Sequence, residues 1–351
     1  MLSSHMRDLK EKIKNIAIEV GFDLVGVARV EEYPEMAAFL NWVESGYGAD
    51  MSYLTDKTSP RINPDEVLPG AKSVISCGLL YNTNPDRSID MNSTNHAWVS
   101  RYAWGKDYHY IVGEKLGDLV GRMSIELPQP FSHRCYVDTG PVLERTFAYH
   151  AGLGWFGKNS CLINPKHGSY FFIGEILTDL ALEPDRETSD FCGSCTRCID
   201  ACPTNAIVAD GVVDSRKCIS YHTIENRGTI PESIRADMGH HIFGCDICQE
   251  VCPWNVKSPL SQESEFMPRA YMFHPTFGSL ADRIMKHYPD AFPKSPLKRP
   301  KQAGLLRNLF IVIGNKGNSD FLPLLDEISV DGDEILRETR EWAIKQIRER
   351  A

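Results

Sequence analysis

Apolar and polar residues follow two different periods in the N-terminal part of the chain. Residues 7–20 place apolar side chains at every third or fourth position, which predicts a helix that ends at Gly21. Apolar and polar residues alternate in segment 22–30, and segment 73–81 is mostly apolar; both have the length of a strand. A Pro-Gly turn precedes the second segment. The pattern therefore predicts an N-terminal helix and two strands, with helical and loop segments between them.

Two more strands are expected at 135–142 and 169–177, so strands separated by helices predict a layered α/β domain through about residue 180. Helical periodicity returns near the C-terminus in segments 304–315 and 336–350, with a shorter helix around 321–328. Paired short helices of this kind predict a small helical-repeat module.

Closely spaced cysteines occupy the region between these two parts. The first run has the spacing C-x2-C-x2-C-x3-C-P of bacterial ferredoxins and consists of Cys192, Cys195, Cys198 and Cys202. A second run repeats the ending C-x2-C-x3-C-P with Cys245, Cys248 and Cys252, and Cys218 supplies an eighth thiol. Eight thiols with this spacing predict two [4Fe-4S] clusters with four ligands each.

The last cysteine of such a run ligates the other cluster in two-cluster ferredoxins, which predicts crossed ligation. The first cluster would then be held by Cys192, Cys195, Cys198 and Cys252, and the second by Cys202, Cys218, Cys245 and Cys248. Structural zinc is the alternative for C-x2-C pairs, but the doubled x2-x2-x3 spacing fits zinc poorly. Disulfides between such close cysteines would be strained. The other cysteines, Cys77, Cys135 and Cys161, are expected to be reduced core thiols.

Charge and composition narrow the class of protein. The 351 residues carry a net charge of −9, which argues against indiscriminate coating of nucleic acid but not against a local basic face. Such a face is expected from Arg283 to Lys316, where eight basic residues and one acid give +7. A solvated helical face or a dimer surface is the alternative. The sequence has no apolar signal core, twin-arginine pair or run of 18 apolar residues, so we expect a soluble cytoplasmic protein.

Three local strings allow more than one interpretation. Glycines 152, 154 and 157 have the G-x-G-x-x-G spacing of a dinucleotide site, but the strand-turn-helix context that such a site needs is not expected there. The string DYHYIVG from Asp107 misses a cobalamin-ligating pattern by one residue, and we interpret it as coincidence. Asp138 lies at a predicted strand end, before a Gly-Pro turn, where it fits either a turn-stabilising or a chemical role.

Seven strings, in this order around the cysteine runs, closely resemble the epoxyqueuosine reductase family: SRYAWGKDYH, VDTGPVLER, AGLGWFGKNS, GSYFFIGEILTDL, CISYHTIE, GCDICQEVCPWN and LLRNLFIVIGN. The resemblance covers nearly the whole chain, although many family members run further at the C-terminus. It implies an enzyme that reduces the epoxide of epoxyqueuosine at the wobble position of tRNA to queuosine, through cob(I)alamin fed by two [4Fe-4S] clusters.

The resemblance also implies the architecture and the partners. We expect an α/β cobalamin-binding domain at 1–185, a two-cluster ferredoxin-like domain at 186–262 and a C-terminal α-helical, HEAT-like tRNA-binding module at 263–351. The partners would be the tRNA anticodon stem-loop carrying epoxyqueuosine and an external low-potential electron donor such as flavodoxin or ferredoxin. A monomer without membrane contact is expected.

Individual site residues follow from the same resemblance. Asp138 matches the proton donor of the family, a role that requires burial to raise its pKa. The cobalamin candidates are Arg61, Arg101, Asp138, Lys158, Asn159, Ile173 and Ser220. From the basic run, the candidates for tRNA contact are Lys286, Lys294, Lys298, Arg299, Lys301 and Arg307.

Two other classes remain open from the sequence. A corrinoid reductive dehalogenase would share the cobalamin and the paired clusters, but such enzymes are typically exported on a twin-arginine signal. An electron-transfer ferredoxin-type module fused to a binding domain would explain the clusters without cobalamin. The visible spectrum after cobalamin addition and turnover with modified tRNA or an organohalide would separate the three.

Overall fold

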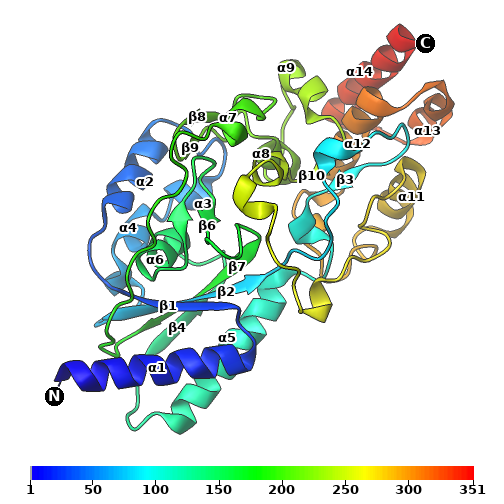
Figure 1. Cartoon of the computed structure of the whole chain (residues 1–351). Helices are drawn as coiled ribbons and strands as arrows, with labels where there is room; N and C mark the ends of the chain where they lie inside the picture. Colours follow the sequence, from blue (N-terminus) through cyan, green and yellow to red (C-terminus); the bar gives the residue numbers. More distant parts are fainter. Residues whose placement is uncertain (1) are drawn as a thin grey trace.

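The computed structural model describes residues 2–351, which run from a sheet with its helices near the N-terminus to a group of helices at the opposite end (Figure 1). The predicted first helix is α1 (Leu2–Val20), and Gly21 ends it with a φ of +99°, a conformation that glycine adopts without strain. Among the described residues, no helix is both long enough and apolar enough to cross a membrane.

The main sheet has the strand order β1 (Leu24–Arg29), β2 (Ser73–Leu80), β7 (Phe171–Thr178) and β4 (His133–Tyr136). Three of the predicted strands are confirmed within a residue or two. The expected strand at 135–142 is corrected, because it begins at His133 and already ends at Tyr136, after which the chain turns into a loop. All neighbouring strands of the sheet are antiparallel, a direction that the hydrophobic pattern does not specify.

Helices cover both faces of this sheet (Figure 1). On one face lie α1 and α5 (Tyr108–Glu126), and a Cβ on Gly174 of β7 would come within 2.7 Å of Val112 on α5. The other face is covered by α2 (Pro34–Glu44) and α6 (Glu144–His150), where Leu177 of β7 shares a core with Phe147. Because side chains alternate along a strand, Glu175 points to the same side as Leu177, toward α6. The turns α3 (Ser52–Thr55) and α4 (Thr58–Ile62) follow α2.

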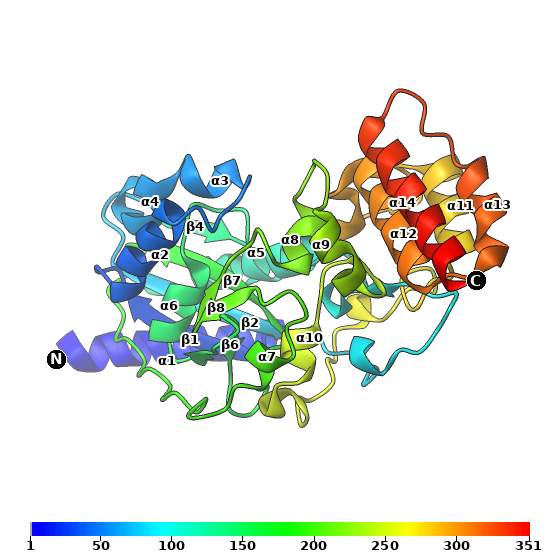
Figure 2. The same ribbon diagram turned by 90° about the horizontal axis from the view of Figure 1, so that it is seen from above.

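Short elements carry the cysteine runs. They are β5 (Trp155–Phe156), β6 (Leu162–Ile163), α7 (Arg197–Asp200), β8 (Ile207–Ala209), β9 (Val212–Val213), α8 (Ile219–Ile224), α9 (Glu232–Arg235), β10 (His241–Phe243) and α10 (Ile247–Glu250). Seen from above, α8 lies between the sheet domain and the C-terminal helices (Figure 2), and it contacts one of them, α12. The glycine string 152–157 leads into the β5–β6 hairpin rather than a helix, so it lacks the context of a dinucleotide site.

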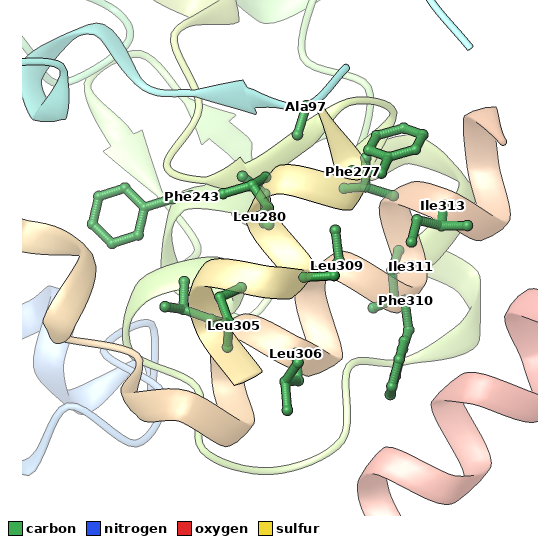
Figure 3. Packing of buried hydrophobic residues seen from close by; sticks show 14 of the residues in the cluster. Ala97, Phe243, Phe277, Leu280, Leu305, Leu306, Leu309, Phe310, Ile311 and Ile313 are labelled. Atoms are coloured by element: carbon green, nitrogen blue, oxygen red, sulfur yellow. The ribbon is translucent and has the colours of Figure 1, made fainter. Parts of the chain in front are cut away.

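The C-terminal helices are α11 (Phe277–His287), α12 (Lys301–Lys316), α13 (Leu322–Glu327) and α14 (Glu334–Arg350). The last three confirm the helices predicted there, whereas α11 is not predicted from the sequence. Helix α12 packs closely on α14, where a Cβ on Gly314 would meet Trp342 at 2.7 Å. Their core also contains a segment from far upstream, with Trp98 of β3 (Trp98–Val99) and Trp104 fully buried in it. Figure 3 shows this core, in which Ala97 and Phe243 lie near Leu280 and Leu309.

Candidate functional site

The first set of neighbouring cysteines comes from both runs. Cys192 and Cys252 pack into one apolar cluster with Trp155, and the Trp155 indole N–H donates to Cys192 Sγ at 3.4 Å. Burial raises the pKa of Cys252 to about 11, with contributions from the neighbouring thiols of Cys192 and Cys198. Burial likewise raises the pKa of Cys198, to which Cys192 and Cys195 contribute. The structure therefore brings Cys252 close to Cys192 and Cys198, which lie more than fifty residues earlier.

The second set gathers around α8 and α10. Burial raises the pKa of Cys218, which begins α8, and the thiol of Cys202 adds to this. Cys245 has a strongly raised pKa because it is buried and because Cys218 lies nearby. The pKa of Cys248 is raised by its hydrogen bond with Cys161, by burial, and by the thiols of Cys245 and Cys218. Cys202 thus neighbours Cys218 of the second set, although it belongs to the first run in sequence.

The three remaining cysteines differ from one another. Cys77 is fully buried, as expected for a core thiol. Cys135 is exposed, which corrects its expected place in the core, because it lies on the edge strand β4. Cys161 is half-buried in the β5–β6 region and contacts Cys248 of the second set, so it is a neighbour of the cysteine sites rather than part of an apolar core.

Asp138 sits in the loop after β4, with a left-handed φ of +60° that aspartate tolerates better than most residues. Arg61 ties this loop down, since its guanidinium donates to the carbonyls of Gly140 at 3.2 Å and Val142 at 3.4 Å. Asp138 Oδ2 accepts a hydrogen bond from the Tyr108 hydroxyl at 2.8 Å. It also lies 3.5 Å from His109 Nε2, an ion-pair distance that is long for a hydrogen bond.

The protein contacts of Asp138 favour its ionised form. Desolvation by the surrounding protein pushes its pKa up, but hydrogen bonds from His109 and Tyr108 outweigh this and lower the pKa overall. The side chain is 61% exposed. The raised pKa that we expect for a proton donor depends on burial against the cofactor and the substrate, which these protein contacts do not supply. At neutral pH, Asp138 is a carboxylate beside His109.

Two further groups next to Asp138 have shifted pKa values. Burial raises the pKa of Glu144 to about 8, and the charge of Asp138 adds to this. Desolvation lowers the pKa of His109, but hydrogen bonds with Asp107 and Asp138 outweigh it and raise the value to about 9. Sequence reasoning missed His109 and Glu144. The signal available for His109 was the Asp-Tyr-His string at a helix start, where Asp107 accepts from the His109 backbone N–H at 3.1 Å and caps α5.

Helix α8 links the Asp138 surroundings to the second cysteine set. Cys218 precedes its first residue, and Glu225 follows its last. Seven residues at 1.5 Å each put these ends about 10 Å apart along the helix axis. Glu225 binds Arg299 through two hydrogen bonds of 2.9 Å, and the charge of Arg299 is one of the causes that lower the pKa of Asp138. The guanidinium of Arg299 also lies over the ring of Tyr53, 5.4 Å from its centroid.

The structure places the other sequence-predicted cobalamin residues at several locations. Asn159 and Ser220 lie beside the second cysteine set, since the Asn159 amide donates to the Cys248 carbonyl at 3.3 Å and Ser220 is on α8. Ile173 is half-buried on the α6 face of β7. Lys158 is in the β5–β6 turn and pairs with Asp210 at 3.1 Å. Arg101 is buried, and its guanidinium donates to Asn82 and to the carbonyls of residues 84 and 86.

Some residues of the basic run are buried in the structure, and others lie on the surface. Arg307 is only 2% exposed, and it donates to the carbonyls of His222 at 2.7 Å and Asn226 at 2.9 Å and to that of Gly228. It cannot reach a tRNA phosphate, so its assignment as a tRNA contact is wrong. Arg299 is engaged with Glu225 beside Asp138. The lysines of the run lie at least partly on the surface: Lys286, Lys294, Lys298 and Lys301.

Comparison with known proteins gives two family matches. Residues 191–255 match the 4Fe-4S double cluster binding domain, and residues 61–139 match the family described as Epoxyqueuosine reductase QueG, DUF1730. The first match spans all eight predicted cluster cysteines, and the second contains Arg61, His109 and Asp138.

Solved structures of similar shape are also epoxyqueuosine reductases. One, in complex with an epoxyqueuosine-modified tRNA stem loop, is 29% identical with a TM-score of 0.83, covering 97% of this chain and 90% of that one. Another, from Bacillus subtilis, is 28% identical with a TM-score of 0.85 and the same coverage; its catalytic aspartate loop is swung out of the active site.

Similar sequences carry the same name. Epoxyqueuosine reductase of Aliivibrio fischeri is 39% identical over 97% of this chain and 92% of its own length. Epoxyqueuosine reductase of Xanthomonas campestris is 38% identical over 97% of this chain and 96% of its own. With such identity over almost the whole of both sequences, this chain belongs to the epoxyqueuosine reductase family.

Proposed function

We propose that this protein reduces the epoxide of epoxyqueuosine in tRNA to give queuosine. The observation that carries the proposal is the placement of Asp138 and its proton-bearing neighbours at one end of α8 and a set of four cysteines at the other. An oxygen-removing reduction needs both electrons and protons at one carbon–oxygen bond. Family membership favours this reaction over reductive dehalogenation and over simple electron transfer.

The eight cysteines would hold two [4Fe-4S] clusters with crossed ligation. In support, Cys252 shares an apolar cluster with Cys192, while Cys202 adds to the raised pKa of Cys218. Each thiol that binds a cluster must lose its proton, so cluster binding releases protons. Electrons from an external low-potential carrier such as flavodoxin or ferredoxin would enter through these clusters.

The residues around Asp138 fit a large cofactor with polar edges. Within the described part of the chain, two polar side-chain atoms there are buried without a hydrogen-bond partner: Arg61 Nε and Glu144 Oε1. The amide groups at the edge of cobalamin can donate and accept such bonds, and Asn159 and Ser220 approach from the cluster side. When bound, cobalamin supplies a cobalt centre able to act as a strong nucleophile toward an epoxide carbon.

Residues of the protein would then supply the proton that the leaving epoxide oxygen needs. Asp138 would deliver a proton to the oxygen that leaves the epoxide carbon, while Arg61 holds its loop and Tyr108 orients its Oδ2. Because the carboxyl has a lowered pKa, it must be protonated within the site before each delivery.

The lysines of the basic run would bind the phosphates of the anticodon stem. A wobble base lies in a single-stranded loop and can be turned out of its stack into a pocket, whereas the stem offers mainly phosphates. Lys298 and Lys301 flank Arg299, which lies beside Asp138, so phosphates held there would be close to the proposed active site. We propose the same domain limits as above, 1–185, 186–262 and 263–351, with HEAT-like repeats in the last and a monomeric protein.

The test is conversion of tRNA that carries epoxyqueuosine under anaerobic conditions. The purified chain is supplied with iron, sulfide, cobalamin and a low-potential reductant, and the nucleosides are analysed by mass spectrometry after digestion. We expect queuosine to form only when both cobalamin and the reductant are present. Failure of the iron-loaded, cobalamin-loaded protein to form queuosine, with an active family member as positive control, would refute the proposal.

A further inference from the structure

The imidazole of His109 is fixed between two carboxylates. Its Nδ1 lies 2.7 Å from Oδ1 of Asp107, the residue that caps α5. Its Nε2 faces Oδ2 of Asp138 at 3.5 Å. A contact at both ring nitrogens favours the imidazolium, which has an N–H to donate on each side. The side chain as a whole is 34% exposed, while Nε2 itself is buried beside Asp138.

Tyr108 holds this arrangement in place. Its hydroxyl donates to the same Asp138 oxygen at 2.8 Å, and its ring stacks on Phe172 of β7 with centroids 4.2 Å apart. The other neighbour of the Tyr108 ring is the imidazole of His109, also at 4.2 Å. Tyr108 therefore contacts both Asp138 and His109, and its stacking on Phe172 fixes the two groups relative to the sheet.

We propose that His109 stores the proton that Asp138 delivers, and returns Asp138 to its acid form in every turnover. This inference rests on the proposed function and assigns His109 a positioning role that acts through Asp138. The N–H bond at Nε2 breaks as an O–H bond forms on Oδ2, and that O–H proton then passes to the departing epoxide oxygen. The neutral His109 regains its proton from water. Apo sites commonly show such contacts longer than in the working complex, so the 3.5 Å gap is compatible with transfer.

The charges around the pair explain why a proton is kept there. Asp107 and Asp138 favour the imidazolium, while Arg299 favours the ionised form of Asp138. Asp138 and His109 titrate as one unit. Together they share a single proton below about pH 9, which is the raised pKa of His109. Three other ionisable groups interact with the charge of Asp138 from separate elements: Tyr53 of α3, Tyr102 before α5 and Glu144 of α6. Behind them, Arg61 of α4 interacts with Glu144, and Glu225 after α8 interacts with Tyr53 and Tyr102.

The pH dependence of turnover follows from this sharing. Below about pH 9 the proton divides between Asp138 and His109 in a ratio that pH does not change, so the rate should be flat until pH passes that value. Without His109, Asp138 must take its proton from solvent. The protonated fraction of a carboxyl with a pKa near 4 falls about tenfold for each pH unit above that value.

The experiment compares His109→Gln with the wild type between pH 5.5 and 9 in the epoxyqueuosine-tRNA assay. We expect the variant to lose about tenfold in rate per pH unit, and added imidazole to restore part of it. His150→Gln is the matched control, because His150 also lies between two carboxylates, Glu35 at 2.9 Å and Glu187 at 2.6 Å, and stacks on Tyr33. It lies at the far end of α6 from Glu144, and its profile should stay flat.

A flat profile for His109→Gln, at any absolute rate, would overturn the proposal, since a merely structural role lowers the rate equally at all pH values. A second readout is independent of turnover. In protein with ¹⁵N-labelled histidine, His109 should titrate near pH 9, and Asp138→Asn should lower that value. Titration of His109 near 6.5 in the wild type would reject the proton store even if the protein forms queuosine. Absence of queuosine with the expected titration would instead reject the proposed function.

Discussion

The double variant Cys198→Ala/Cys252→Ala tests which cysteines share a cluster. The wild type should bind about eight iron atoms per chain in two cubanes. If Cys252 belongs with Cys192, as their common apolar cluster indicates, both substitutions fall on the same site. That cluster should be lost and the other kept, leaving about four iron atoms.

The matched control is Cys198→Ala/Cys202→Ala, which changes two adjacent ligands of the first run. Crossed ligation puts one substitution on each cluster, so neither site keeps four thiolates. Iron and acid-labile sulfide are measured after anaerobic reconstitution, and electron paramagnetic resonance of the reduced protein reports intact [4Fe-4S] centres. We expect one intact centre in the Cys198/Cys252 variant and none in the control. The opposite result, an intact centre in the control only, would show that each run holds its own cluster.

Three further predictions concern single features of the site and its support. Asp138→Asn should lower turnover by about 10²–10⁴-fold at unchanged iron content, and near-normal turnover would remove Asp138 from the reaction. Arg307→Met removes the donor to the carbonyls of His222, Asn226 and Gly228. Because each carbonyl left without a partner costs about 1–3 kcal/mol, denaturant titration should show a loss of at least about 3 kcal/mol in the free energy of unfolding. A loss below about 1 kcal/mol would contradict this reasoning. Reversal of Lys294, Lys298 and Lys301 to Glu should weaken tRNA binding and flatten its salt dependence, and an unchanged salt slope would show that these lysines do not face the phosphates.

Much of the framework could be predicted because it depends on short-range pattern. Helix α1 and strand β2 follow from the spacing of their apolar residues, and the cysteine runs follow from ligand spacing alone. The contact between His109 and Asp138 has no such signature. It joins a helix start to a strand end 29 residues later, and only the packing of α5 against the sheet brings the two together.

The apolar residues around Arg307 in the sequence indicate that it is buried, but the local net charge does not. It lies in the segment GLLRNLFIVIGN, which is apolar on every side of the helix, and a helix of that kind is enclosed by protein. An arginine inside it must find carbonyl partners, as it does around α8. Counting charges along the sequence cannot separate such a residue from the lysines on the surface.

The joint core of the upstream tryptophans and the C-terminal helices affects how the protein is made. Trp98 and Trp104 leave the ribosome long before their cover, since α12 begins at Lys301, 197 residues after Trp104. At about 5–20 residues per second, they wait roughly 10–40 s for that helix. During this time two large aromatic side chains lack their final partners, so the nascent chain should be a target for chaperones that bind exposed apolar segments.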